Sequence, residues 1–327
     1  MKIKDRVYGI AEIKDSVLIE LINSKPVQRL KGINQAGASQ YAIKGKTVTR
    51  YEHSVGVMIL LKKLGASVEE QIAGLLHDVP HTAFSHVIDF VFKKNNPDQE
   101  FHERFHEKII RQSEIPKILK KYDFKINMIL DENNFGLLEK KLPDLCADRI
   151  DYTLRDMTAR EGFSDKINEY ISNFIVHDGE IIIKNKETAK KFAEDYMKID
   201  EEIWSFPKEI ALFQILADAV KIALDEKILN EDDLFKDDLY VYSKLKKSQN
   251  KRILKKLDML NPNLKIIDDP NNYDFYTKNK LRYVDPKFLD SDKSTTKVSE
   301  KFSEFSTKIS EHIKLIQRGH FIRIVSF

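Results

Sequence analysis

The chain has 327 residues, of which 42% are hydrophobic and 33% are charged, and its net charge is only +3. This length suits one large domain or two modest ones, and so small a net charge does not favour a nucleic-acid partner, without excluding one. No apolar run approaches the roughly 18 residues of a membrane span, and the N-terminal stretch lacks the apolar core of a signal peptide. The single cysteine, Cys146, permits no internal disulfide, so we expect a reducing, cytoplasmic setting.

Glycine and proline are scarce, with 11 and 9 residues, which predicts a mainly helical protein. Residues 38–49 (ASQYAIKGKTVT) are expected to form a small hairpin or loop. From Glu52 onward apolar residues recur at helical spacing, and Gly65 is the expected C-cap of this helix.

A second helix is expected over residues 67–76, and it runs directly into His77-Asp78. Its start carries the capping-box pattern, in which Ser67 is followed three residues later by Glu70. A strong hairpin signal lies at 174–184, where β-branched runs flank Asp178-Gly179. The other predicted helices cover 84–94, 103–112, 115–131, 143–159, 187–203 and 207–228.

Beyond residue 229 the composition changes to Asp- and Lys-rich stretches with short strand-like runs. We therefore predict two parts, residues 1–229 and a smaller α+β subdomain over 230–327. Strands are expected at LKIID, KLRYVD and HFIRIVSF, and a mobile loop at 290–299. The lysine run at 244–256 is interpreted as a solvated helix face, with a phosphate- or RNA-binding patch as the alternative.

Histidines crowd into one stretch of the chain. Six of the nine fall between residues 53 and 106, namely His53, His77, His81, His86, His102 and His106. The His77-Asp78 pair ends an apolar helix, where a charged carboxylate is costly unless it is paired or binds a metal. Imidazole and carboxylate together suit Fe, Mn, Ni or Zn better than Mg. A metal site built from this pair, His53 and a later aspartate is therefore predicted.

The later aspartate is not fixed by spacing alone. The segment LPDLCADRIDYTLRD offers Asp144, Asp148, Asp151 and Asp156, several of which share one helix face. Asp151 is interpreted as a helix-face salt bridge rather than as a ligand.

Four ordered motifs resemble the HD phosphohydrolase superfamily: VQRLKGINQAG…TRYEHSVGV, HDVPHTAFSHVID, FHERFHEKII and DRIDYTLRD. They are most similar to its deoxynucleoside-triphosphate triphosphohydrolase branch, which includes dGTPase-like and sterile-alpha-motif/HD enzymes. The resemblance implies an HD-domain helical bundle that binds one divalent ion (Mn, Fe, Ni, Co, Zn or Mg) through His53, His77, Asp78 and Asp148. It further implies catalytic roles for His81, His86, Asp89 and His102, with substrate contacts from Arg50, Gln35, Tyr152 and Asp156. His106 competes with His102 for one role, and His102 is preferred.

The chain departs from that family pattern at Pro80 and Thr82, where glycine is usual, and 204–220 lacks the tyrosine that rejects a 2′-hydroxyl. We expect a phosphorylated small-molecule substrate, with a deoxynucleoside triphosphate as the first choice, and a homo-oligomer. The competing readings are an HD phosphodiesterase, nuclease or nucleotidase, and a nucleotide-sensing module without turnover.

Overall fold

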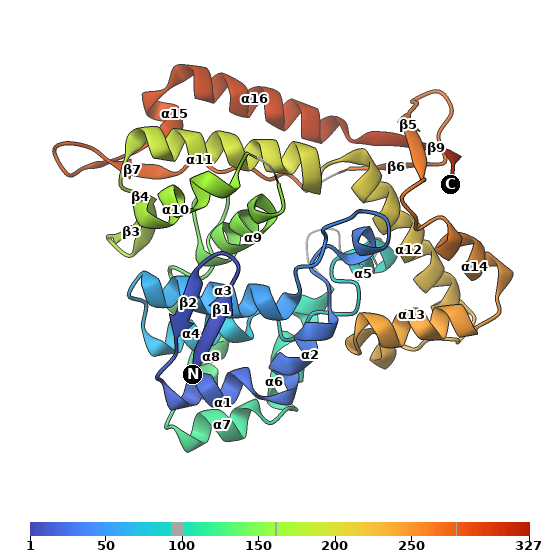
Figure 1. Cartoon of the computed structure of the whole chain (residues 1–327), viewed down its shortest axis with the longest axis horizontal. Helices are drawn as coiled ribbons and strands as arrows, with labels where there is room; N and C mark the ends of the chain where they lie inside the picture. The colour runs from blue at the N-terminus through green and yellow to red at the C-terminus, as the bar shows by residue number, and fades with distance from the viewer. Residues whose placement is uncertain (93–100, 161, 279) are drawn as a thin grey trace.

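The computed structural model describes residues 1–92, 101–160, 162–278 and 280–327, and helices dominate it (Figure 1). The sheets are small, with two, four and three strands. The prediction of a mainly α protein with small β elements is therefore confirmed.

The chain begins with an antiparallel hairpin that the sequence did not predict. The elements of this region are β1 (Lys2–Asp5), β2 (Gly9–Glu12), α1 (Ser16–Ile22), α2 (Lys25–Arg29) and the 3₁₀ turns η1 (Leu30–Gly32) and η2 (Gly37–Tyr41). Residues 38–49 form this last turn and a loop rather than a hairpin, with one bridge between Asn34 and Thr49.

Three helices form the centre of the bundle: α3 (Arg50–Lys63), α4 (Val68–Leu76) and α9 (Ala147–Thr158). A capping box between Thr49 and Glu52 starts α3, and Gly65, with φ +78°, lies just past its end as expected. At α4 the predicted capping box is only half formed, because Ser67 caps the amide of Glu70. The Glu70 carboxylate instead accepts the backbone amides of Leu137 and Leu138.

Helices α3 and α9 approach each other at Gly56. A Cβ atom at this position would lie 1.8 Å from Nη2 of Arg155 and 2.2 Å from Oδ1 of Asp151. The absence of a side chain at Gly56 therefore gives Arg155 and Asp151 of α9 the space they occupy.

The segment after His77-Asp78 is a series of short helices: α5 (Val87–Phe92), η3 (His102–Phe105), α6 (His106–Arg111), α7 (Ile115–Lys121), α8 (Ile126–Leu130) and η4 (Glu132–Asn134). The helix predicted over 84–94 starts only at Val87, because Phe84 and Ser85 have φ angles of 62° and 52°. Its last two residues, 93 and 94, lie outside the described residues. The helix predicted over 115–131 is broken in two near Asp123, which has φ 63°.

The middle of the chain contains the predicted hairpin. It lies between α10 (Ser164–Asn173) and α11 (Lys186–Ile199) and consists of β3 (Phe174–His177) and β4 (Glu180–Ile183). Its antiparallel pairing confirms the Asp178-Gly179 turn, whose φ angles are 49° and 77°. Helix α11 continues into the π-helical turn η5 (Asp200–Trp204), and α12 (Pro207–Asp225) follows.

The last third of the chain combines helices with two sheets. Its elements are η6 (Glu231–Phe235), α13 (Asp238–Lys247), α14 (Lys251–Asp258), β5 (Lys265–Asp268), β6 (Phe275–Thr277), β7 (Lys287–Leu289), β8 (Thr295–Lys297), α15 (Val298–Lys301), α16 (Ser303–Arg318) and β9 (His320–Ser326). The strands expected near 264–268 and 320–327 are confirmed, and they pair with each other. The strand expected at 280–285 is wrong, since the strand β7 starts only at Lys287, and the loop expected at 290–299 contains β8.

Elements on both sides of residue 230 pack together. Strand β7 pairs in parallel with β4, so one sheet includes strands from both predicted parts. Helices α11 and α16 lie side by side (Figure 1), joined by ion pairs from Lys190 to Glu304 and from Lys308 to Glu194. A division at residue 230 stays a prediction. Among the described helices, none combines the length and apolar character needed to cross a bilayer.

Candidate metal centre

Residues from three helices meet at one point in the bundle. Helix α3 supplies His53, the end of α4 supplies His77 and Asp78, and the first turn of α9 supplies Asp148. Nε2 of His53 lies 2.8 Å from Oδ1 of Asp148 and 3.3 Å from Nε2 of His77. Asp78 completes the group, with Oδ1 3.5 Å from Nε2 of His77 and Oδ2 3.8 Å from Nε2 of His53. The four side chains proposed from the sequence as ligands are thus brought together.

The hydrogen bonds of the two imidazoles fix which ring nitrogen faces the shared space. Nδ1 of His53 lies 2.8 Å from Oδ2 of Asp151, and Nδ1 of His77 lies 2.7 Å from the carbonyl oxygen of Gly74. Since both partners are acceptors, each Nδ1 carries a proton, and each Nε2 faces the shared space with Asp148. This arrangement of nitrogen and oxygen donors fits a divalent cation of the Mn, Fe, Co, Ni or Zn type.

Opposite charges stabilise one another inside this group. Burial works to lower the pKa of His53, but its hydrogen bonds to Asp148 and Asp151 outweigh burial and raise the pKa to about 9. Burial works to raise the pKa of Asp148, and the hydrogen bonds from His53 and His77 nonetheless hold it well below its usual range. The carboxylates of this group therefore require positive charge nearby. Protons on the imidazoles provide that charge here, and a bound cation would take their place.

One side of the centre is open to solvent. The side chain of His53 is 1% exposed and that of Asp78 is 5% exposed, whereas His77 and Asp148 are 20% and 22% exposed. Water and a phosphate group can therefore approach from the side of His77 and Asp148.

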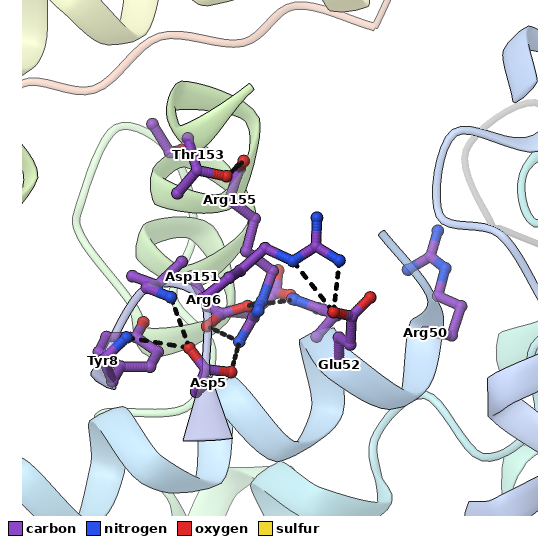
Figure 2. A network of polar contacts seen from close by, with 12 residues as sticks. Asp5, Arg6, Tyr8, Arg50, Glu52, Asp151, Thr153 and Arg155 are labelled. Atoms are coloured by element: carbon purple, nitrogen blue, oxygen red, sulfur yellow. Dashed lines mark hydrogen bonds and ion pairs between the residues drawn. The ribbon is translucent and has the colours of Figure 1, made fainter. Parts of the chain in front are cut away.

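A buried polar network binds Nδ1 of His53, and Figure 2 shows its members Asp5, Asp151 and Arg155. The Asp151 carboxylate that binds His53 also accepts from Arg155 at 2.7 Å, and Arg155 reaches Asp5 of β1 at 2.8 Å. The salt bridge expected for Asp151 is therefore present, but its contact with His53 was missed. Asp151 follows Asp148 by three residues, which was the only available signal, and nothing in the sequence pointed to Asp5.

A second group of imidazoles lies beside the first. Ligand atoms of His81, His86 and His102 lie within 4.8 Å of one another, and the rings of His81 and His102 stack with centroids 3.7 Å apart. Nε2 of His81 is 3.2 Å from Oδ1 of Asp78, which connects the two groups. Burial, with the charges of Arg50 and His102, holds the pKa of His81 well below its usual value. His81 is thus neutral near pH 7.

His86 has the orientation expected from its spacing to Asp89. Nδ1 of His86 lies 3.0 Å from Oδ2 of Asp89, and Oδ1 of Asp89 accepts the amide of Phe101. His102 joins this histidine group, whereas His106 does not. Burial lowers the pKa of His106 to about 4.

Arg50, predicted to bind phosphate, points into the centre. It is only 5% exposed and donates to Asp78 at 2.9 Å and to Ser85 at 3.0 Å.

The residues predicted to contact the rest of the substrate lie farther along. Tyr152 and Asp156 follow Asp148 on α9 at intervals of four residues and are half-buried. The Tyr152 hydroxyl lies 2.7 Å from that of Tyr196, and Asp156 accepts from the Trp204 indole at 2.7 Å. Gln35 is half-buried, and its backbone amide donates to the Val48 carbonyl.

Comparison with known proteins agrees with this arrangement. The HD domain family matches residues 50–156. The uncharacterized protein YdhJ of Bacillus subtilis is 42% identical over 330 residues, covering 99% of each chain. The metal-dependent phosphohydrolase cns2 of Cordyceps militaris is 33% identical over 219 residues, which is 65% of this chain and 63% of that protein.

Two further proteins are similar over a shorter length or in fold. The deoxynucleoside triphosphate triphosphohydrolase SAMHD1 of Xenopus laevis is 35% identical over 100 residues, which is 26% of this chain and 16% of that protein. A solved phosphohydrolase of Bacteroides thetaiotaomicron shares the fold with a TM-score of 0.71 at 19% identity, covering 97% of this chain and 98% of that one.

The fold and these relatives define a metal-dependent phosphohydrolase with a divalent metal cofactor. The chain belongs to the HD-domain phosphohydrolase superfamily, with a relationship to its dGTPase-like members.

Proposed function

We propose that this protein hydrolyses deoxynucleoside triphosphates to nucleoside and tripolyphosphate, using one divalent ion held by His53, His77, Asp78 and Asp148. The observation that carries this proposal is the position of Asp78, which contacts both the metal group and the histidine group. Phosphate bound at the metal would therefore lie within reach of several imidazoles. The choice of a nucleotide rests on the similarity to SAMHD1.

The chain's own residues have separate tasks in this proposal. A bound metal polarises a phosphoryl oxygen and lowers the pKa of a water ligand. Arg50 binds phosphate oxygens through its N–H groups. Arg50 would do so while keeping its bond to Ser85, because that bond comes from Nε, whereas Nη1 is the atom that donates to Asp78. The one N–H of neutral His81 is directed from Nε2 to Asp78, so His81 would bind phosphate through Nδ1 after that nitrogen takes up a proton.

Proton transfer is assigned to the exposed end of the histidine group. His86 is 32% exposed, its Nδ1 is held by Asp89, and its ring is one of the three imidazoles whose ligand atoms lie within 4.8 Å of one another, so we assign proton exchange with substrate or water to His86. His102 is proposed to extend that path, because its ligand atom lies within 4.8 Å of those of His81 and His86. Gln35, Tyr152 and Asp156 are proposed to contact the nucleoside.

The test is a substrate panel read by product identity. Deoxynucleoside and ribonucleoside triphosphates, nucleoside monophosphates, cyclic nucleotides and bis-p-nitrophenyl phosphate are each incubated with Mn, Fe, Co, Ni, Zn or Mg. Tripolyphosphate with free nucleoside supports the proposal. Inorganic phosphate as the product indicates a nucleotidase, and a nucleoside monophosphate from a cyclic or diester substrate indicates a phosphodiesterase. Metal binding without turnover of any compound indicates a sensing module.

Two variants control this panel. His77→Ala is expected to lose both bound metal and turnover, whereas His177→Ala, in the β3–β4 hairpin, keeps both. Normal turnover by a metal-free His77→Ala protein would contradict the proposed site.

Nucleic acid is not favoured as the substrate. In the lysine run, Lys244, Arg252 and Lys256 form ion pairs with Asp233, Glu226 and Asp218. These pairs support the interpretation of a solvated helix face. A homo-oligomer stays a prediction, to be tested by light scattering.

A further inference from the structure

Residues 79–86, called here the histidine loop because they carry His81 and His86, are held by a carboxylate far away in the sequence. Asp238, at the start of α13, accepts the amide of Phe84 at 2.7 Å through Oδ1. The neighbouring amide, that of Ala83, donates to the carbonyl of Leu234 at 2.8 Å. Asp238 is only 6% exposed, so the contact lies in the interior, between the catalytic loop and residues outside the matched HD region.

The other oxygen of Asp238 holds a second part of the site. Oδ2 accepts the backbone amide of Asn34 at 2.9 Å and the side-chain amide of Gln40 at 2.8 Å. The carbonyl of Asn34 in turn accepts from the Ser85 hydroxyl at 2.7 Å. Asn34 directly precedes Gln35, which is proposed to contact the nucleoside.

These bonds continue as far as the metal group. Ser85 accepts from Nε of Arg50 at 3.0 Å, and Nη1 of Arg50 donates to Asp78 at 2.9 Å. A continuous chain of hydrogen bonds therefore leads from Asp238 through Asn34, Ser85 and Arg50 to Asp78.

The backbone of the loop needs such support. Phe84 and Ser85 are consecutive residues with φ angles of 62° and 52°, in the left-handed region that favours glycine. Such conformations persist only when the surroundings over-determine them, and they concentrate at functional sites. The bond from the Phe84 amide to Asp238 lies at this strained position.

A second contact between the same two segments comes from Arg29. Its guanidinium donates to the carbonyls of Val79 and His81 at 2.6 and 2.8 Å, and to those of Phe235 and Lys236 at 3.0 and 3.2 Å. Arg29 thus joins the start of the histidine loop to the segment that leads into Asp238. The loop is thus joined to residues 234–238 directly at Ala83 and Phe84, and through Arg29 at its start.

We propose that Asp238 is a positioning residue of the active site, which holds the histidine loop and the Gln35 segment in register with the metal group. The part of the proposal that concerns turnover rests on the proposed function, whereas the part that concerns loop geometry does not. A displacement of about 1 Å in such a loop is enough to lower turnover by about 100-fold.

The experiment compares Asp238→Ala and Asp238→Asn with the matched control Asp237→Ala. Asp237 is the adjacent carboxylate and caps the same helix through the amide of Tyr240. Asp238→Asn keeps the side-chain volume, but its NH₂ group must face either the amide of Phe84 or those of Asn34 and Gln40, so one side is lost. This variant tests the idea even if Asp238→Ala fails to fold.

Hydrogen–deuterium exchange of the whole chain is measured first, without substrate. In Asp238→Ala we expect exchange to rise at least about tenfold both at Ala83 and Phe84 and at 33–40. In Asp238→Asn we expect the same rise in one of these two segments, on the side that the NH₂ group faces. Exchange in α11 and the manganese content per chain should not change. Turnover of the best substrate in the panel should then show a fall in kcat of about 10- to 100-fold, with little change in KM.

Each result decides a separate point. Unchanged protection of both the loop and residues 33–40 in Asp238→Asn, or the same loss in Asp237→Ala, overturns the positioning role. Lost protection with unchanged kcat also overturns it, because the loop would then not need to be held for catalysis. If the wild-type protein turns over no compound, the proposed function fails, and the exchange data alone still decide whether Asp238 holds the loop.

Discussion

Oδ2 of Asp151 lies 2.8 Å from Nδ1 of His53 and 2.7 Å from Nε of Arg155. One buried carboxylate oxygen therefore accepts hydrogen bonds both from an imidazole of the metal group and from a buried guanidinium. A carboxylate in this position orients the ring and increases the basicity of its other nitrogen. Asp151 would thus act through His53 on a metal bound at the proposed site.

Asp151→Asn should weaken binding of manganese by about 10- to 100-fold, because the amide no longer supplies negative charge behind His53. A competition titration with a fluorescent chelator measures this affinity. Asp144→Asn is the matched control, since Asp144 precedes the same helix without contacting His53. Equal affinities in both variants would show that Asp151 has no part in the metal site.

His86→Asn should lower kcat by about 10²- to 10⁴-fold, as expected for the loss of a general acid or base. Metal content should stay at the wild-type level, because His86 is not in the group formed by His53, His77 and Asp148. Steady-state kinetics and metal analysis on one preparation give both values. Asp89→Asn should cause a smaller fall, since it leaves the imidazole in place and changes its orientation. Turnover within about threefold of wild type in His86→Asn would remove His86 from the mechanism.

Trp204 is the single tryptophan, and its indole donates to Asp156 while its ring packs against Tyr152 and Tyr196. A nucleotide that reaches Asp156 should change the surroundings of this indole. We expect a saturable change in tryptophan emission when dGTP is added to metal-depleted protein, and none with inorganic phosphate. If calorimetry shows dGTP binding while emission stays constant, the nucleoside does not lie at Asp156.

His312 of α16 should make stability depend on pH. Burial works to lower its pKa, but its bonds to Asp200, Glu201 and the Arg282 carbonyl raise it to about 9. Because this value lies above the roughly 6.5 of an unfolded histidine, the stabilisation is complete below about pH 6.5. It is lost as the pH rises through 9.

His312→Asn should therefore lower the free energy of unfolding by on the order of 2 kcal/mol at pH 6 and by much less at pH 10. Urea unfolding at both pH values measures the difference. His177→Asn, the same substitution at a half-buried histidine of the β3–β4 hairpin, should follow wild type. A constant difference between His312→Asn and wild type at the two pH values would contradict the protonated state.

Local signals in the sequence predicted local structure well. The turn at Asp178-Gly179 was correctly identified because the conformation it requires is encoded within a few neighbouring residues. The break at Asp123 was missed because apolar periodicity resumes on both sides of it. The strand expected at 280–285 was wrong, since alternation does not reveal whether a partner strand lies alongside, and pairing with β4 starts farther on.

The convergence of His53, His77, Asp78 and Asp148 could be predicted because the order and types of these residues follow a known pattern. The residues that hold them could not. Asp5 lies 150 positions before Arg155, and Asp238 lies 154 positions after Phe84. Contacts at such separations depend on how whole elements pack, and an aspartate on its own gives no indication of its partner.

Gly56 makes the metal centre sensitive to a position that touches no ligand. Any side chain there would overlap Arg155 and Asp151, and the displaced carboxylate would carry His53 with it. Even replacement by alanine, a change that normally favours a helix, should thus impair metal binding from the rear of the site. We therefore expect residue 56 to tolerate no side chain, although it belongs to helix α3 without being one of the four proposed ligands.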